Sequence, residues 1–274
     1  MSRSRSWLAT FFVLAASLPF LKKILWRAWY NLLARYDAQA ELRFMNYGYA
    51  DQAASTAVLD EQDEPYRYPT ALYRHVLDGM DVNGLQLTEV GSGRGGGAEW
   101  IARTLQPEKI SGVDLSPEAV ASCQQVYNHN NLEFMAAAAD ALPFADDSID
   151  IVVNVESSHC YPDMQAFLAE VKRILRPGGQ MAFCDLRTRN GVKELENSFS
   201  QSGLEFDGLK VISPQVIAAL DAMHESRELR ITEKIPAWLR HAFADFAALQ
   251  DTVIYDALKS GSMVYVSAQL RKPV

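Results

Sequence analysis

The stretch Leu85–Gly97 constrains this chain more than any other, because an apolar run ends there in an acid and then breaks into glycines. Glu89 lies near the end of the predicted strand, where α/β sheets bind ligands. Gly91 and Gly93 let the backbone turn tightly and approach a ligand without a Cβ in the way. The spacing Gly91-x-Gly93-x-x-Gly96 also satisfies the dinucleotide fingerprint. Alone, the stretch fits a dehydrogenase, a methyltransferase or a glycine-rich turn.

Strand and helix patterns alternate after this stretch. The pattern predicts strands at 85–90, 109–114, 132–137, 149–155 and 180–186, and helices at 71–80, 95–105, 117–127 and 164–175. Ser116 is the expected N-cap of the helix at 117–127, with Pro117 in its first turn. Strands that alternate with helices of this length indicate an α/β fold, with a mostly parallel sheet covered by helices on both faces.

The C-terminal part departs from this alternation. A strand is predicted near 209–212, then a helix opened by Ser213 and Pro214, a helical stretch at 236–258, and a last alternating strand at 263–270. We interpret the helical part, at about 214–260, as a lid. Four aromatic residues in it line an apolar substrate pocket or simply form core, since both fit helical spacing: Trp238, Phe243, Phe246 and Tyr255.

Length and charge divide the chain into three parts. With 274 residues, 49% hydrophobic and 22% charged, we expect one main domain at 81–274, preceded by a cap and linker at 37–80. The net charge is −8, yet the first 36 residues carry six of the 26 bases and no acid. The other 20 bases face all 34 acids, which argues against a nucleic-acid surface on the main domain. Three cysteines without paired spacing predict no disulfide framework.

Residues 1–36 are predicted to associate with a membrane surface. Residues 6–21 carry no charge and, as a helix, would reach roughly 24 Å, less than the ~30 Å hydrocarbon core. Residues 23–36 form an amphipathic pattern with basic residues on one side. The alternatives are that this helix packs on the catalytic domain, or that residues 6–21 are a signal peptide. We favour attachment on the cytoplasmic side of a membrane.

The residues that distinguish a site for NAD from one for S-adenosylmethionine follow the glycines in the sequence. Asp114 ends the second strand, 21 residues beyond Gly93, where a carboxylate can hold both hydroxyls of a ribose in NAD or in S-adenosylmethionine. Asp140 follows the third strand, Asn154 lies in the fourth, and Arg176–Gly179 precedes the fifth. A dehydrogenase has no reason to carry this set at these intervals.

Together these residues make the chain resemble class I S-adenosylmethionine-dependent methyltransferases over roughly 85–186. The resemblance implies a Rossmann-like sheet of seven strands whose last strand, at 263–270, is antiparallel, and S-adenosylmethionine as cofactor. It assigns Glu89, Gly91, Ser92 and Gly93 to the methionine part, Asp114 and Leu115 to the ribose and its neighbourhood, Asp140 and Ala141 to the adenine edge, and Asn154 and Val155 to the backbone path beside the sulfonium.

Three shorter motifs narrow the resemblance. Val155–Pro162, Gly93–Gly97 and Phe44–Tyr49 are similar to the phthiotriol/phenolphthiotriol dimycocerosate O-methyltransferases and related fatty-acid O-methyltransferases. The similarity runs from about Trp29 to the end of the chain. It implies a hydrophobic, lipid-like acceptor.

An aliphatic hydroxyl needs a base before it can be methylated. His159 follows the fourth strand at the edge where the methyl group should emerge, and Asp185 lies near the end of the neighbouring fifth strand, where it can orient the imidazole. Related small-molecule O-methyltransferases carry such a pair, so the resemblance supports this assignment. Alternatively, His159 only shapes the pocket and Asp185 binds a loop backbone. Tyr161 is a candidate for an additional hydroxyl at the site, and no metal-ligand spacing is visible.

The sequence therefore predicts a methyltransferase that uses S-adenosylmethionine to methylate an oxygen of a small hydrophobic or lipid-like acceptor. The first alternative is a C-methyltransferase acting on a sterol, terpenoid or quinone-like acceptor. Two further alternatives are a non-catalytic scaffold that keeps the fold and an NAD-dependent oxidoreductase. The oligomeric state is left open.

Overall fold

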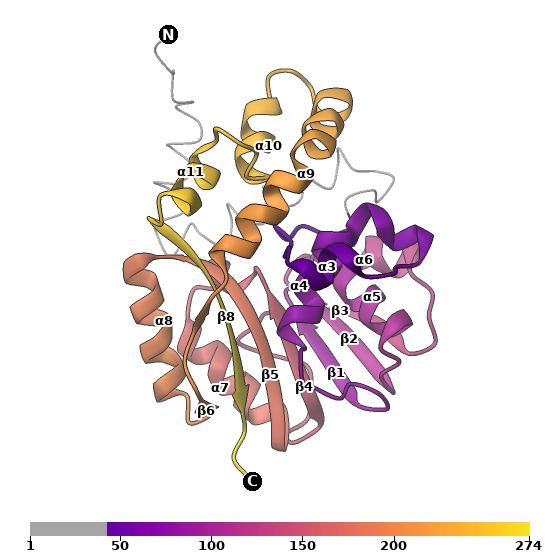
Figure 1. The fold of residues 1–274 in the computed structure, drawn as a ribbon. Helices are drawn as coiled ribbons and strands as arrows, with labels where there is room; N and C mark the ends of the chain where they lie inside the picture. Colours follow the sequence, from indigo (N-terminus) through magenta and orange to yellow (C-terminus); the bar gives the residue numbers. More distant parts are fainter. Residues whose placement is uncertain (1–42) are drawn as a thin grey trace.

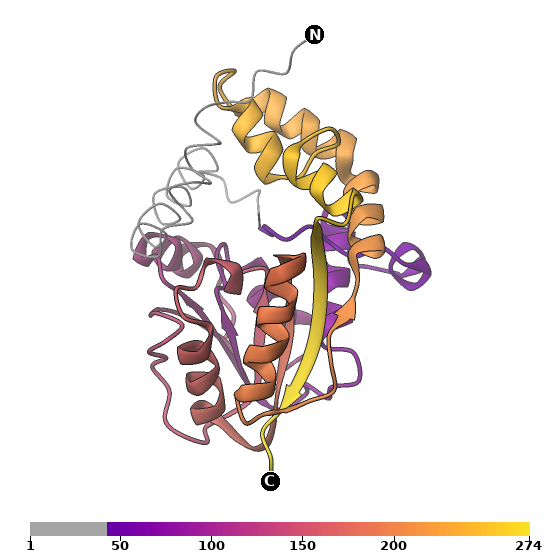
Figure 2. The same cartoon turned by 90° about the vertical axis from the view of Figure 1, so that its left-hand side faces the viewer.

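Residues 43–274 are described by a computed structural model, in which helices cover both faces of one mixed sheet (Figures 1 and 2). The apolar and amphipathic segments predicted within 1–36 lie outside the described residues. Across 43–274, no helix combines the length and the apolar character needed to cross a bilayer.

The sheet follows the order β3-β2-β1-β4-β5-β8-β6, and β7 also pairs with β8. The strands are β1 Gln86–Val90, β2 Lys109–Asp114, β3 Leu132–Ala136, β4 Ile149–Val155, β5 Leu175–Thr188, β6 Glu205–Phe206, β7 Lys210–Val211 and β8 Met263–Arg271. Strands β1 to β5 pair in parallel, and β8 runs antiparallel beside β5. The predicted α/β fold with an antiparallel last strand is confirmed.

The edge of the sheet differs from the predicted count of seven strands. Two strands of two residues each, β6 and β7, occupy the edge next to β8, where one strand near 209–212 was expected. Gly208 between them has a φ of +111°, in the region that favours glycine, so the backbone turns there and the ladder is interrupted. The sheet therefore has eight strands, and its edge is built from two short pieces.

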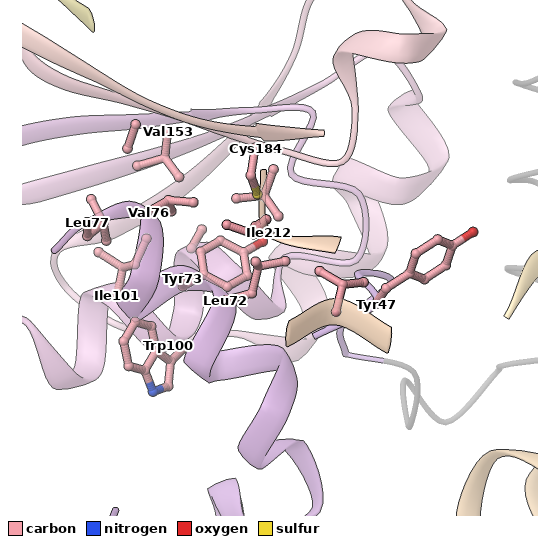
Figure 3. Packing of buried hydrophobic residues seen from close by; sticks show 14 of the residues in the cluster. Tyr47, Leu72, Tyr73, Val76, Leu77, Trp100, Ile101, Val153, Cys184 and Ile212 are labelled. Carbon is pink, nitrogen blue, oxygen red and sulfur yellow. The ribbon is translucent and has the colours of Figure 1, made fainter. Parts of the chain in front are cut away.

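Two apolar layers sandwich the sheet because successive residues of a strand face opposite sides. Val153 of β4 packs in one layer with Trp100 and Ile101, whereas Val152 packs in the other with Phe167. The first layer is covered by α4 Arg67–Val76 and α5 Gly96–Thr104, and the second by α7 Met164–Ile174 and α8 Arg189–Gln201. Figure 3 shows the first layer close up, with Trp100 and Ile101 beside side chains of α4.

Helix starts follow local capping chemistry. The Ser116 hydroxyl accepts a hydrogen bond from the Ala119 N–H at 3.2 Å, and α6 Pro117–Val126 begins with proline, as predicted. Asp163 caps α7 in the same way, accepting from the N–H groups of its second and third residues.

The described part of the cap and linker predicted at 37–80 contains short helices that the sequence pattern did not indicate. Asp51 caps α3 Gln52–Thr56 through the Ala54 N–H at 2.7 Å. The 3-10 helix η1 Glu61–Tyr66 follows, and α4 begins at Arg67, not near residue 71. Arg67 donates to the carbonyls of Ala54 and Ala57, both at 2.8 Å, and so ties α3 to α4. The sequence pattern did not indicate these helices because they are held by a polar cap and by side-chain hydrogen bonds, which leave no apolar periodicity.

Three C-terminal helices lie beyond the carboxyl ends of the parallel strands (Figures 1 and 2). They are α9 Ser213–Lys234, α10 Arg240–Phe246 and α11 Val253–Lys259. Two of their aromatic residues are core, since Phe243 packs with Ile235 and Leu239, and Tyr255 is 4% exposed. Trp238 is 73% exposed. The interpretation of 214–260 as a lid stays a prediction.

Gly97 in α5 offers a stability test, because a Cβ at this position would overlap the ring and hydroxyl of Tyr73. Gly97→Ala should lower the free energy of unfolding by about 1–3 kcal/mol despite the better helix propensity of alanine, because the buried ring has little room to move. Chemical denaturation followed by circular dichroism measures this change.

Gly191→Ala is the matched control, since Gly191 lies in the first turn of α8 and its added Cβ would meet the Thr188 hydroxyl at 3.2 Å. It should change the free energy of unfolding by no more than about 0.5 kcal/mol. Equal effects of the two substitutions would contradict the tight contact between Gly97 and Tyr73.

Candidate active site

The glycine loop after β1 is hydrogen-bonded to the end of β2. The N–H groups of Gly91 and Ser92 donate to the Val113 carbonyl at 2.7 and 3.0 Å, and the Gly93 N–H donates to Asp114 Oδ2 at 2.9 Å. Gly91 and Gly93 have φ of +81° and +51°. A Cβ on Gly93 would meet only the mobile methyl end of Met45, at 2.7 Å, so the backbone conformation and not the space favours glycine there.

Polar atoms around this loop are left without partners. Glu89 Oε2, Ser92 Oγ and Asn154 Oδ1 are buried and make no hydrogen bond within the described part of the chain. Buried polar groups are nearly always satisfied in a finished fold. Three such groups at the ends of β1 and β4 therefore fit a polar ligand, and the predicted cofactor residues are compatible with S-adenosylmethionine.

Glu89 is a buried acid, and one of its carboxyl oxygens accepts a side-chain hydrogen bond. Its Oε1 accepts a hydrogen bond from the Tyr73 hydroxyl at 2.5 Å. Burial raises the pKa of Glu89 to about 8, and the hydrogen bonds from Tyr73 and the Ala98 N–H only partly oppose this rise. Glu89 is therefore largely protonated at neutral pH in the protein without ligand.

The residues predicted for the ribose and adenine lie along the neighbouring strand ends. Asp114 ends β2, and its Oδ1 accepts from the Ser116 N–H at 2.9 Å while Oδ2 holds the glycine loop. Leu115 beside it is 38% exposed. Asp140 and Ala141 are exposed in the turn after β3, which pairs with β2. Asp114 thus binds the N–H of the α6 cap residue and anchors the loop, and its carboxylate oxygens keep further acceptor capacity.

Asn154 joins β4 to the end of β1. Its Nδ2 donates to the Val90 carbonyl at 2.9 Å and to the hydroxyls of Ser157 and Tyr161 at 2.8 and 3.0 Å. Val155, next in the strand, is 6% exposed. The structure thus gathers Tyr161 and the end of β4 against the start of the glycine loop, as expected for a site between β1 and β4.

His159 and Asp185 are paired. His159 Nδ1 lies 2.8 Å from Asp185 Oδ1, and the aspartate is fully buried. His159 follows β4 in the 3-10 helix η2 Ser158–Cys160, and Asp185 lies in β5. With Nδ1 held by the carboxylate, Nε2 is the ring atom that can take a proton from an acceptor.

The Asp185 carboxylate is bound on both oxygens. Oδ2 accepts from the Ser158 hydroxyl at 2.6 Å and the His159 N–H at 2.8 Å, and it also pairs with Arg187 at 2.9 Å. Burial alone would raise the pKa of Asp185, but the charges of Arg187 and His159 and the hydrogen bonds outweigh burial and hold the pKa below its usual range.

The pKa of His159 moves in the opposite direction. Burial lowers it, whereas Cys160 and the Asp185 carboxylate raise it, and the net result is a pKa well above the usual value. A base at this position must lose that proton before it can act, so the charges around Asp185 decide when His159 is available.

Sequence reasoning missed a segment that crosses the edge of the sheet. The Gly96 N–H donates to the Arg43 carbonyl at 3.2 Å, and the Tyr47 N–H donates to Glu156 Oε1 at 2.6 Å. Residues 43–47 therefore run from the glycine loop to the end of β4. The sequence signal for this segment was the Phe44–Tyr49 motif. It indicated similarity to a family of methyltransferases but not where the segment lies in the fold.

Glu156 was also missed, although it directly follows β4. It has a φ of +47°, which is rare for a residue with a side chain, and its Oε1 also accepts from the Tyr265 hydroxyl at 2.5 Å. Burial raises its pKa to about 7 against the hydrogen bonds from Tyr265 and the Tyr47 N–H. A glutamate in the sequence does not indicate a positive φ, so this backbone conformation could not be predicted from the residue type.

Across residues 43–274, no group of three or more His, Cys, Asp or Glu side chains is arranged to hold a metal ion. His129, His224 and His241 each face a single carboxylate, at 3.3, 3.9 and 3.7 Å. His75 stacks on the Tyr49 ring.

Known proteins share both the sequence and the fold. Residues 88–183 match the family described as Methyltransferase domain. The phthiotriol/phenolphthiotriol dimycocerosates methyltransferase of Mycobacterium leprae is 35% identical over 93% of this chain and 94% of its own, and that of Mycobacterium tuberculosis is 36% identical over 96% of both. The fatty-acid O-methyltransferase of Mycolicibacterium smegmatis is 36% identical over 77% of both chains.

Two solved structures illustrate the fold. The geranyl diphosphate C-methyltransferase of Streptomyces coelicolor, with S-adenosyl-L-homocysteine bound, has a TM-score of 0.58 at 17% identity and covers 83% of this chain and 91% of its own. A phosphoethanolamine N-methyltransferase of Haemonchus contortus has a TM-score of 0.63 at 15% identity, covering 77% and 59%. The chain belongs to the class I S-adenosylmethionine-dependent methyltransferases, in the group that contains the phthiotriol/phenolphthiotriol dimycocerosates methyltransferases.

Proposed function

We propose that this methyltransferase methylates an oxygen of a small hydrophobic or lipid-like acceptor, with His159 as general base and Asp185 as the residue that orients it. The observation that carries this proposal is the 2.8 Å contact between His159 Nδ1 and the buried Asp185 carboxylate. A positioned imidazole suits an acceptor whose proton must be removed during methyl transfer.

Bound S-adenosylmethionine supplies an electrophilic methyl group on a sulfonium, so the acceptor oxygen must be aligned with it and deprotonated. In this proposal His159 takes the proton at Nε2. Asp185 keeps Nδ1 protonated and stabilises the imidazolium that forms. In the same proposal, Glu89 holds the methionine part of the cofactor and Asp114 holds its ribose.

The acceptor class is supported by the relatives, since two of them are phthiotriol/phenolphthiotriol dimycocerosates methyltransferases and one is a fatty-acid O-methyltransferase. We extend this class to the present chain as a lipid-like molecule with a hydroxyl or carboxyl group. Attachment of residues 6–36 to the cytoplasmic side of a membrane would bring such acceptors close, and this stays a prediction.

Methyl-labelled cofactor tests the proposal. Purified protein is incubated with it and a total lipid extract, and the labelled product is identified. A methyl ether, which is stable to alkali, or an alkali-labile methyl ester supports O-methylation. A new carbon–carbon bond would favour the C-methyltransferase alternative, whose fold is shared by the geranyl diphosphate enzyme. Label in no lipid fraction would contradict the acceptor class.

His159→Ala should lower kcat by about 10²- to 10⁴-fold, because it removes the base that deprotonates the acceptor. The dissociation constant of S-adenosylhomocysteine should stay nearly unchanged, since His159 is assigned to the acceptor side. Single-turnover kinetics and calorimetric titration measure the two quantities.

His241→Ala is the matched control, because this histidine has a 63% exposed side chain on α10. It should leave kcat at the wild-type value. If His159→Ala retains activity within a few-fold of wild type, the assignment of the base is wrong.

Cofactor binding at pH 7 should release up to about one proton from Glu89. Its pKa of about 8 makes it mostly protonated in the free protein, and the cationic amino group of the cofactor's methionine part favours the carboxylate. Titration calorimetry in two buffers of different ionisation enthalpy detects the released proton as a buffer-dependent binding enthalpy.

Glu89→Gln should abolish this buffer dependence, whereas Glu196→Gln, on the exposed side of α8, should preserve it. A binding enthalpy that is identical in both buffers for the wild-type protein would show that Glu89 does not change its protonation when the cofactor binds.

A further inference from the structure

Arg187 folds back onto the dyad from the strand that carries Asp185. It lies two residues further along β5, and its side chain is 13% exposed. Its Nη1 is 2.9 Å from Asp185 Oδ2 and also donates to the Leu186 carbonyl at 2.8 Å, while Nη2 donates to the Ser158 hydroxyl at 2.6 Å. The guanidinium is therefore fixed in place by three groups.

One carboxylate thus serves two cationic partners. Asp185 Oδ1 binds His159 Nδ1, and Oδ2 binds Arg187 and the Ser158 hydroxyl. A buried aspartate that faced only an imidazole would strongly favour the imidazolium. A guanidinium carries its charge at every working pH and competes for the same negative charge.

We propose that Arg187 is a positioning residue that shares the Asp185 carboxylate with His159 and thereby limits how strongly this carboxylate holds the imidazole in its charged form. Arg187 touches neither acceptor nor cofactor in this proposal. It acts through Asp185, by keeping that group ionised and by limiting how strongly it holds the proton of His159. The effect of Arg187 on catalysis rests on the proposed function, in which His159 is the base.

Other charged groups near the dyad come from separate elements, and substitutions at Arg187 leave these residues in place. Glu156, after β4, acts on both His159 and Asp185, and Arg227 of α9 faces Glu156. Cys160 lies beside His159 on η2. Two buried tyrosines bond to Glu156, Tyr47 through its N–H and Tyr265 of β8 through its hydroxyl. Burial raises the pKa of both hydroxyls, so they ionise only at high pH. Because these groups are present in every variant, the comparison of Arg187→Gln with Arg187→Lys isolates the charge at position 187.

The expected direction follows from the charges. A base must be neutral, so kcat/KM rises as the pH increases through the pKa of His159. Loss of the guanidinium leaves the Asp185 charge to His159 alone, which raises the pKa of His159 and moves the rise in kcat/KM to higher pH.

The test measures the pKa of His159 by NMR titration of ring-labelled histidine in the full chain without cofactor. Arg187→Gln should raise this pKa by about 0.5 to 1 unit, and Arg187→Lys, which keeps the charge, should restore most of the wild-type value. Arg189→Gln is the control, because Arg189 is exposed at the start of α8 and bonds the Gly261 carbonyl. It should not move the pKa of His159.

The ascending limb of the kcat/KM profile should shift with the same sign and size in Arg187→Gln. An unchanged or lower pKa of His159 in that variant, or an equal rise in Arg187→Lys, would overturn the proposal. If Arg187→Gln does not fold, Arg187→Met replaces it, since it also removes the charge, and it should give the same rise; no rise there would also overturn the proposal. The titration needs no acceptor, so it remains decisive if methyl transfer to oxygen fails.

Discussion

The fully buried carboxylate of Asp185 is the constraint on which the acceptor side of this protein depends. A charge removed from water must be satisfied by hydrogen bonds and cations, or the fold loses several kcal/mol. Asp185 meets this requirement with the Leu186 N–H and the side chains of Arg187 and Ser158, in addition to both the N–H and the ring of His159. These bonds fold the segment after β4 onto β5. The orientation of the proposed base is therefore a consequence of how one acid is solvated inside the sheet.

The cofactor side is built on the opposite principle. Glu89, Ser92 and Asn154 keep buried oxygens without partners within residues 43–274, and Glu89 is held in its protonated form by burial. Unsatisfied groups cost stability, and a fold retains them where a ligand will complete them. The two halves of the proposed site thus differ: the proposed base already has its hydrogen-bond partner, whereas the buried oxygens at the glycine loop have none within residues 43–274.

The sequence predicted the parts of this arrangement that depend on local pattern. The parallel strands, the Ser116 cap and the glycine loop follow from periodicity and turn chemistry, and the pairing of His159 with Asp185 follows from the order of neighbouring strands. The short helices at 52–66 were missed because capping by Asp51 and bracing by Arg67 leave no apolar period. Glu156, Tyr47 and Arg187 were missed because their importance lies in contacts between distant segments, such as the bond from the Tyr47 N–H to Glu156. Nothing in their spacing indicates such contacts.

The fold by itself does not choose the atom that receives the methyl group, since this sheet is shared with a C-methyltransferase and an N-methyltransferase. The choice must lie in what differs at the carboxyl edge, and here three elements converge on it. Residues 156–160 carry the proposed base, and residues 43–47 cross from the glycine loop to Glu156. Arg227 of α9 donates to the carbonyls of Asn46 and Ala247. The crossing segment is therefore bonded to the cofactor loop on one side and to the C-terminal helices on the other. A change in either neighbour must be accommodated by the same few backbone groups, so the geometry of the acceptor site and that of the cofactor site are physically linked through residues 43–47.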